Sequence, residues 1–194
     1  MPNCCPKADR GMQHPMSEAA VLVIDMLNPY RHEDADLLAP NVADIVDPLA
    51  GLISRVRARD DVDLIYVNDN YGDFTADFDD LVDAALHGER PDLVTPIAPD
   101  GNCLRLLKVR HSAFYASSLD YLLGRLDTPR LILTGQVTEQ CIMYTALDAY
   151  VRHFSVVVAP DAVAHIDPEL GDAALTMMHR NMHAEIMPAG KCLD

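Results

Sequence analysis

A continuous apolar run near the start of the chain, from Ala19 to Ile24, ends directly at a carboxylate, Asp25. A run of this length with several β-branched residues is typical of a strand that is buried on both faces. Such a strand belongs inside a sheet that is covered on each side. The run therefore favours an α/β protein over a sheet with one face in water.

Strand and helix patterns alternate through the rest of the chain. Further strands are expected over 63–68, 104–109, 131–134 and 155–159, with a short edge strand at 185–187. Helices are expected over 47–59, 77–87, 118–126, 139–152 and 168–181. Asp47 as an N-cap and Pro48 as the first helical residue mark the start of the first helix. The alternation predicts a parallel sheet with helices on both faces.

Length and composition indicate one folded domain. The 194 residues can form one hydrophobic core, so we expect a flexible tail over 1–17 and a single domain over 18–194. The net charge of −15 is spread along the chain, which argues against nucleic acid and membrane partners. No apolar run approaches the ~20 residues of a membrane span, and no secretory signal is recognisable. A cytoplasmic location is the resulting expectation.

The cysteines favour the chemistry of a single thiol. Their number is odd, at five, and their spacing is irregular, which argues against a disulfide framework. No CxxC pair is present, which argues against a structural zinc site. Cys4 and Cys5 fall in the expected tail. A redox or thiol-transfer role has little support, because Cys141 has no resolving cysteine near it in the sequence.

Side chains that can take part in binding or catalysis follow the predicted strands. In open parallel sheets, ligands bind beyond the carboxyl ends of the strands. Those places hold Asp25, the segment 68–71, Lys108 and the loop 135–140. No GxGxxG or GxxxxGK[ST] motif follows a strand, so dinucleotide-binding and P-loop functions lose support.

Cys141 follows the strand 131–134 within a few residues. If Thr138 is the N-cap, Cys141 is the third helical residue. The helix dipole is then expected to lower the pKa of the thiol, and first-turn N–H groups can face an oxyanion. Asp25 can act as the base, and Lys108 lies in an apolar run where a cation is either paired or at a strand edge. A buried cysteine that only fills space, a capping aspartate and a surface lysine are the alternatives.

The chain resembles the isochorismatase-like cysteine hydrolase superfamily, which includes nicotinamidases, N-carbamoylsarcosine amidase and isochorismatases. The resemblance rests on Val23-Ile24-Asp25-Met26-Leu27-Asn28, Lys108-Val109-Arg110-His111-Ser112-Ala113-Phe114, Leu133-Thr134-Gly135-Gln136-Val137-Thr138-Glu139-Gln140-Cys141, Thr145-Ala146-Leu147-Asp148-Ala149-Tyr150 and Val158-Ala159-Pro160-Asp161-Ala162.

This resemblance implies a three-layer α/β/α, Rossmann-like sandwich with a mostly parallel six-stranded sheet. It implies an Asp-Lys-Cys triad of Asp25, Lys108 and Cys141. It also implies a cis peptide at Gln136–Val137, which lets the N–H groups of Val137 and Cys141 form the oxyanion hole. Members of the family commonly self-associate, so a homodimer or homotetramer is expected.

The segment Asn68-Asp69-Asn70-Tyr71-Gly72-Asp73-Phe74 departs from the nicotinamidase pattern. Nicotinamidases carry metal-binding histidines here, and this segment has none, so no metal and no other cofactor is expected. Asn70, Tyr71, Phe114 and Tyr30 are candidates for binding the substrate. A turn-rich loop and ordinary core aromatics are the competing interpretations of these residues.

The predicted function is the hydrolysis of a C–N bond in a small amide or ureido compound through a thioester on Cys141. Isochorismatases proper cleave a vinyl ether and need no nucleophilic cysteine, so the presence of Cys141 favours amide chemistry. A catalytically silent member that acts in binding or assembly is the alternative, as is an ether hydrolase.

Overall fold

A computed structural model describes residues 17–101 and 103–194. The expected tail up to residue 16, with Cys4 and Cys5, lies outside the described residues. Ser17, the last residue of that expected tail, is buried, and its hydroxyl donates to the carbonyl oxygen of Ala19 at 2.9 Å.

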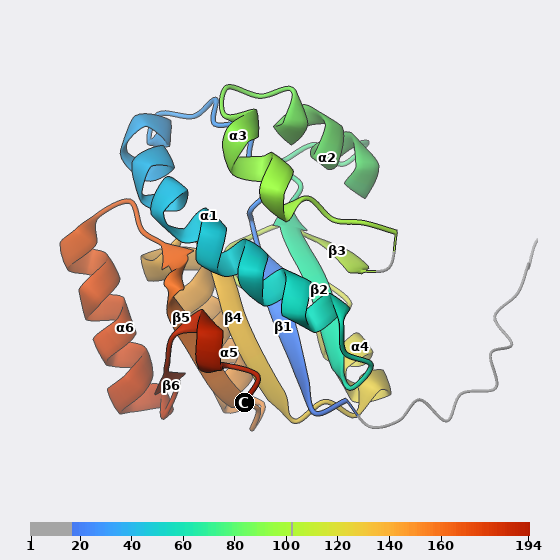
Figure 1. The fold of residues 1–194 in the computed structure, drawn as a ribbon, viewed down its shortest axis with the longest axis vertical. Helices are drawn as coiled ribbons and strands as arrows, with labels where there is room; N and C mark the ends of the chain where they lie inside the picture. Colours follow the sequence, from blue (N-terminus) through green and yellow to red (C-terminus); the bar gives the residue numbers. More distant parts are fainter. Residues whose placement is uncertain (1–16, 102) are drawn as a thin grey trace, which may run out of the picture.

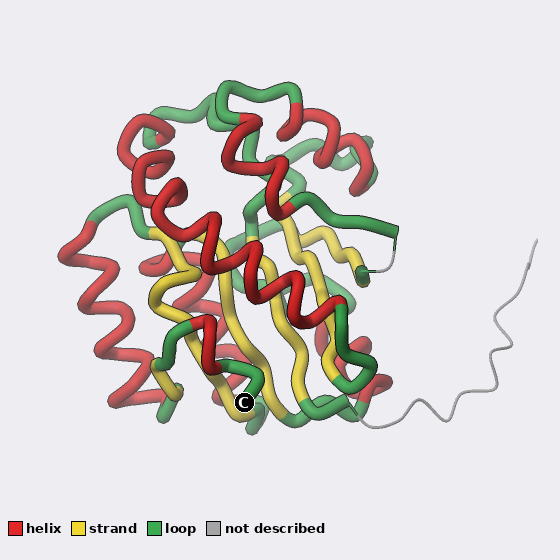
Figure 2. Tube along the Cα trace, viewed as in Figure 1, coloured by secondary structure: helices red, strands yellow, loops and turns green. Residues whose placement is uncertain are grey.

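Six strands form one sheet in the order β3-β2-β1-β4-β5-β6, and every neighbouring pair is parallel. The strands are β1 (Ala19–Ile24), β2 (Val62–Asp69), β3 (Leu104–Lys108), β4 (Arg130–Gln136), β5 (Ser155–Ala164) and β6 (Glu185–Ile186). Their carboxyl ends lie toward the top of Figure 1. In Figure 2 the connecting loops gather at the two ends of the strands. The predicted α/β class is confirmed, with a sheet that is all-parallel.

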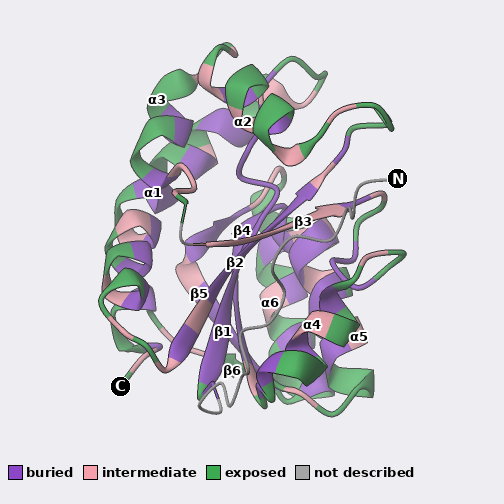
Figure 3. Cartoon of the chain, turned by 90° about the vertical axis from the view of Figure 1, so that its right-hand side faces the viewer, coloured by how far each residue is buried: buried purple, intermediate pink, exposed green. Residues whose placement is uncertain are grey.

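Helices cover both faces of the sheet. They are α1 (Ala35–Arg57), α2 (Phe78–Leu86), α3 (Pro91–Val94), α4 (Leu119–Leu126), α5 (Met143–Val151) and α6 (Pro168–Met182), with short turns η1 (Thr95–Ile97), η2 (Thr138–Ile142) and η3 (Ala189–Lys191). Figure 3 shows α1, α2 and α3 on one side and α4, α5 and α6 on the other, with the sheet between them. This is the three-layer sandwich expected from the sequence.

Strand β1 explains why both layers are needed. Its side chains alternate between two hydrophobic cores: Val21 and Val23 belong to the core beneath α1, and Leu22 and Ile24 belong to the opposite one. All of them are buried. The apolar run therefore serves both faces of the sheet.

The predicted start of the first helix is wrong. Helix α1 begins at Ala35, not at Asp47, and it holds Pro40 and Pro48 in its interior. A proline removes one intrahelical hydrogen bond, and the carbonyl group that Pro48 leaves without a donor belongs to Asp44, which is exposed and can bind water. Packing of the helix on the sheet outweighs this loss.

Helix α1 is long and apolar enough, by length and composition alone, to cross a membrane. The expectation that no segment approaches that length therefore needs correction. Nine of its 23 residues are buried in the core between the helix and the sheet. Its apolar character is accounted for by this packing.

Candidate active site

Three neighbouring strands bring charged side chains to one edge of the sheet. Asp25 directly follows β1, Asp69 is the last residue of β2, and Lys108 is the last residue of β3. Parallel pairing sets Ile24 opposite Val67 and Asp69 opposite Lys108. The register of the sheet thus places the predicted base and the predicted cation together.

Lys108 is the centre of this group, and its side chain is fully buried. Its Nζ lies 2.9 Å from Oδ2 of Asp25, 3.3 Å from Oδ2 of Asp69, 3.1 Å from the carbonyl oxygen of Arg110 and 3.7 Å from Sγ of Cys141. Burial alone would lower the pKa of Lys108, but the charges of Asp25, Cys141 and Asp69 outweigh it and raise the pKa. Lys108 is therefore a buried cation held by two carboxylates.

Asp25 is buried, and burial raises the pKa of its carboxyl group. Lys108, a hydrogen bond with the Cys141 thiol, and the backbone N–H of Asp69 oppose this effect without reversing it. The N–H of Asp69 donates to Oδ1 of Asp25 at 2.8 Å. A carboxylate with a raised pKa is a stronger base than an ordinary aspartate, which suits it to take a proton from a thiol.

The thiol of Cys141 is buried as well, and its pKa is raised above the ordinary value. Burial is the main cause, and the charge of Asp25 adds to it, while Lys108 and the backbone of Val137 act in the opposite direction. The expectation that the helix dipole lowers this pKa is therefore wrong. Burial thus favours the neutral form of the Cys141 thiol, which lies beside the pair of Asp25 and Lys108.

The turn that carries Cys141 differs from the predicted helix start. Residues Thr138–Ile142 form a π turn capped by Val137, so Cys141 is its fourth residue, and α5 begins afterwards at Met143. Thr138 makes no capping bond, and its buried hydroxyl has no partner among the described residues. A wider π turn re-aims the side chain of Cys141 relative to an ordinary first helical turn.

The backbone before this turn is also unusual. The Gln136–Val137 peptide bond is cis. The carbonyl oxygen of Val137 accepts hydrogen bonds from the N–H groups of Gln140 and Ile142, both at 3.1 Å, which lie on either side of Cys141. The side-chain nitrogen of Gln136 donates to the carbonyl oxygen of Asp25 at 2.6 Å and so ties this loop to the end of β1.

Gly135 allows β4 to approach β1 closely at the site. Its φ is +109°, and a Cβ at this position would lie 2.1 Å from the carbonyl oxygen of Ile24. Only glycine fits both the backbone angle and the space. Ile24 and Gly135 are direct partners in the sheet, one residue before Asp25 and Gln136.

A cavity of about 330 Å³ opens above these strand ends. It lies at the switch in strand order between β1 and β4, where open parallel sheets bind their ligands. Its lining consists of Asp25, Asn28, His32, Asp34, Leu38, Asp69, Tyr71, Lys108, Gln136, Val137, Gln140, Cys141 and Ile166. The volume is at the low end for ligand pockets, which indicates a small substrate.

The structure brings only one of the four predicted substrate-binding residues to this cavity. Tyr71 lines it, and its hydroxyl donates to the carbonyl oxygen of Leu27 at 3.0 Å. Asn70 is buried below the loop, where its side-chain oxygen accepts from the N–H of Gly72. Tyr30 and Phe114 also lie outside the lining, and both are packed in the hydrophobic cores.

His111 is a neighbour of the thiol that sequence reasoning did not assign. Its Nδ1 lies 3.9 Å from Sγ of Cys141, and its ring packs on Tyr144 with 5.5 Å between ring centroids. Unlike the triad, His111 is exposed. Among residues 17–101 and 103–194, no group of three or more His, Cys, Asp and Glu side chains is arranged to hold a metal ion.

One known protein family matches most of this chain. The isochorismatase domain model matches residues 19–189. The chain belongs to the isochorismatase family. An uncharacterised isochorismatase family protein, YaaI of Bacillus subtilis, is 34% identical over 170 residues, which cover 88% of this chain and 93% of the relative.

Two further proteins are similar to this chain. Maleamate amidohydrolase of Pseudomonas putida is 29% identical over 161 residues, covering 77% of this chain and 74% of the relative. The crystal structure of N-carbamoylsarcosine amidase from Thermoplasma acidophilum matches with a TM-score of 0.71 and 25% identity, covering 91% of this chain and 99% of that one.

Within this isochorismatase fold, the sequence signal for Asp69 was available but weaker than that for Asp25. Asp69 also ends a strand, but it lies in a polar, turn-rich segment, where a carboxylate does not by itself indicate a functional role. His32, Asp34 and His111 come from loops, and their positions depend on loop geometry that no periodic pattern encodes.

Proposed function

We propose that this isochorismatase-family hydrolase cleaves a C–N bond of a small amide or ureido compound through a thioester on Cys141. The observation that carries the proposal is the buried cluster in which Nζ of Lys108 lies 3.7 Å from Sγ of Cys141 and 2.9 Å from Oδ2 of Asp25. A thiol, a base of raised pKa and a fixed cation are the parts that nucleophilic catalysis by cysteine requires.

The first half of the reaction forms the thioester. The carboxylate of Asp25 takes the proton from Sγ of Cys141, and the thiolate attacks the carbonyl carbon of the substrate. The oxyanion that results accepts hydrogen bonds from the N–H groups of Val137 and Cys141. Asp25 then gives its proton to the leaving nitrogen as the C–N bond breaks, and ammonia or an amine departs.

The second half releases the acid. Asp25, ionised again, takes a proton from a water molecule that attacks the thioester carbonyl carbon. The C–S bond breaks, the acid leaves, and the proton passes from Asp25 to the sulfur. Lys108 remains protonated throughout and stabilises whichever of its two neighbours, Asp25 or the thiolate, carries the negative charge.

The named relatives support amide chemistry over ether cleavage. One is an amidohydrolase of maleamate and another is an amidase of N-carbamoylsarcosine, so both are named for the cleavage of C–N bonds. The small cavity beside Cys141 is of a size that admits such compounds.

Ammonia release from a panel of small amides and ureido compounds tests the proposal. Wild type is expected to hydrolyse at least one compound, and Cys141→Ala none, while Cys103→Ala serves as the matched control because Cys103 is a free cysteine outside the cavity lining. Intact-mass measurement after rapid acid quench is expected to show the acyl group on wild type. Turnover that survives Cys141→Ala would exclude the covalent route. Absence of turnover across the panel, with Cys141 no more reactive to iodoacetamide than Cys103, would favour a silent family member.

A further inference from the structure

The charged groups of the cavity are mostly acidic. Among the described residues, its lining includes the three carboxylates of Asp25, Asp34 and Asp69, and Lys108 is the only lysine or arginine there. The ammonium group of Lys108 is already held by Asp25, Asp69 and a backbone carbonyl group. It therefore has no free hydrogen-bonding capacity with which to bind a carboxylate on a substrate.

His32 lies in the cavity lining and is held by Asn28. Its Nε2 lies 3.2 Å from the side-chain nitrogen of Asn28, and the side-chain oxygen of Asn28 accepts from the N–H of Tyr30 at 2.7 Å. The side-chain nitrogen of Asn28 thus faces the His32 ring, and its side-chain oxygen is taken up by the backbone of the same loop.

Asp34 is the carboxylate in the lining that forms no ion pair with Lys108. It precedes α1, where its backbone carbonyl accepts from the N–H groups of Leu37 and Leu38, but its side chain makes no capping bond. Among the described residues, no hydrogen bond or ion pair to its carboxylate is formed. Asp34 therefore presents an uncompensated negative charge to the cavity.

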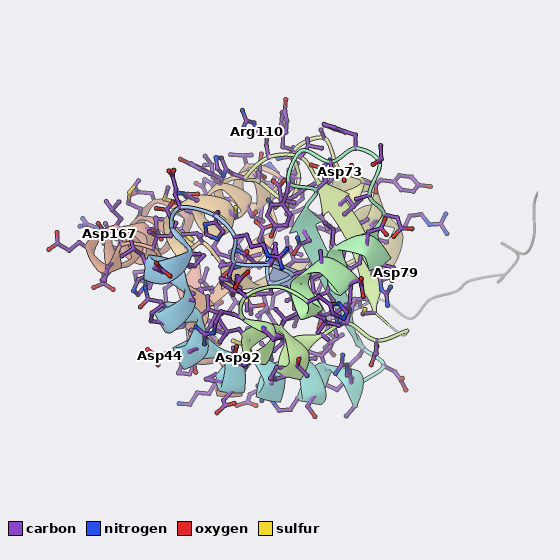
Figure 4. All side chains as sticks on the ribbon, turned by 90° about the horizontal axis from the view of Figure 1, so that it is seen from above. Asp44, Asp73, Asp79, Asp92, Arg110 and Asp167 are labelled. Carbon is purple, nitrogen blue, oxygen red and sulfur yellow. The ribbon has the colours of Figure 1, made fainter. Side chains whose placement is uncertain are left out.

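The surroundings reinforce this charge. The arginines near the β1–α1 loop are paired, Arg31 with Glu89 and Arg90 with Asp92. Seen from above the strand ends, the labelled aspartates and Arg110 all lie at the periphery of the molecule (Figure 4). Arg110 and the exposed His111 are absent from the cavity lining. With a net charge of −15, the whole protein favours approach of cations.

We infer that the cavity selects a substrate that carries a positive charge, an ammonium or guanidinium group, on the part away from the scissile bond, and that Asp34 determines this specificity. The inference rests on the proposed amide hydrolysis and names its substrate class. Substrates with a carboxylate at that position are disfavoured, because Asp34 would repel it and Lys108 is already occupied.

Charged thiol reagents test the selection without requiring turnover. We would measure the rate at which Cys141 is modified by 2-aminoethyl, methyl and 2-sulfonatoethyl methanethiosulfonate, by peptide mass spectrometry, each relative to the same reagent's rate with free 2-mercaptoethanol. Wild type is expected to favour the cationic over the anionic reagent by about tenfold or more, with the neutral one between, and the preference is expected to shrink as salt is added.

Two variants of equal charge change then locate the effect. Asp34→Asn is expected to lower the cationic-to-anionic ratio about fivefold, because its charge adjoins the cavity, whereas Asp36→Asn, outside the lining, is expected to leave it nearly unchanged. Asparagine at position 34 keeps the carbonyl group that accepts the first hydrogen bonds of α1. An unchanged unfolding midpoint would show that the variant is folded. If either variant misfolds, the loss of the wild-type reagent preference with added salt still tests the inference.

The outcomes separate the two proposals. A cationic reagent that is no faster than the neutral or anionic one, or equal effects of Asp34→Asn and Asp36→Asn, would overturn the inference. Turnover of a cationic amide in preference to its neutral and carboxylate analogues would support it. If no amide is hydrolysed while the reagent ratios hold, the proposed function fails and the charge selection stands.

Discussion

The ammonium nitrogen of Lys108 lies 2.9 Å from Oδ2 of Asp25, and the lysine side chain has no exposure to solvent. The same nitrogen lies 3.7 Å from Sγ of Cys141. One buried cation thus adjoins both the proposed base and the proposed nucleophile. The stability of the site and its chemistry are coupled through this contact, because a change to any member alters the charge that the others face.

Removal of the Lys108 charge is expected to be costly. Lys108→Met leaves the carboxylates of Asp25 and Asp69 close together without a cation, and breaking a buried pair in this way costs about 3–5 kcal/mol. Urea unfolding measures the loss, and amide hydrolysis should disappear with it. Lys191→Met is the matched control, since Lys191 is exposed, and it should change stability by less than about 0.5 kcal/mol. Equal effects of the two substitutions would show that the buried ion pair contributes no more to stability than an exposed lysine does.

Asp25→Asn is expected to lower activity strongly and to change the free energy of unfolding in a way that depends on pH. Loss of the base should lower kcat/KM at least about 100-fold. Folding raises the pKa of Asp25 above 3.8, so the stability that this group contributes is fully present below 3.8 and is lost as the pH rises through the raised value. The free energy of unfolding of wild type minus that of the variant should therefore be larger at about pH 4 than at about pH 8. A difference that grows toward neutral pH would mean that folding lowers the pKa instead.

The pH dependence of wild-type activity follows from the same group. In the proposed mechanism, activity requires ionised Asp25 and protonated Lys108. Since both pKa values are raised, the acid limb of kcat/KM should lie above 3.8 and the alkaline limb above 10.5. Steady-state rates across the pH range check this, with the unfolding transition followed in parallel to exclude denaturation. An acid limb at or below 3.8 would count against Asp25 as the base.

Much of this site could be predicted because each triad member follows or ends a strand. The apolar run up to Ile24 fixed the position of Asp25, and parallel pairing brings strand ends to one edge. The start of α1 could not be predicted, since Pro48 is typical of a first helical turn and only tertiary packing explains why it lies inside the helix. The raised thiol pKa of Cys141 was missed for a related reason: burial and the neighbouring Asp25 act through space, and no sequence spacing reports their strength.

His111 should matter less than Asp25 for proton transfer. Its Nδ1 lies 3.9 Å from Sγ of Cys141 and its side chain is exposed, whereas Asp25 is buried and pairs with Lys108, which contacts the same sulfur. His111→Gln is expected to lower kcat by less than about tenfold, below the usual contribution of a general base, and to leave the acid limb in place. The turnover rates of His111→Gln and Asp25→Asn, measured across the pH range, provide the comparison. If His111→Gln abolished turnover and removed the acid limb, the histidine would be the base.

Gly135 is expected to tolerate no side chain. A Cβ there would lie 2.1 Å from the carbonyl oxygen of Ile24, and backbone at both positions is fixed by the pairing of β1 with β4. With φ at +109°, Gly135→Ala combines a collision with a strained backbone and should cost about 3 kcal/mol or more. Urea unfolding measures this loss, and reduced activity should accompany it, because Gln136 and the turn before Cys141 are displaced.

The matched control for this prediction is Gly51→Ala. Gly51 lies in helix α1, where an added Cβ meets nothing within 4 Å. Alanine is a better helix former than glycine, so this substitution should raise the free energy of unfolding by about 0.5–1 kcal/mol. Opposite signs for the two Gly→Ala changes are the expected result. Because both changes add the same methyl group, a loss at Gly135 together with a gain at Gly51 would assign the cost to the close approach of β4 to β1 at the active site.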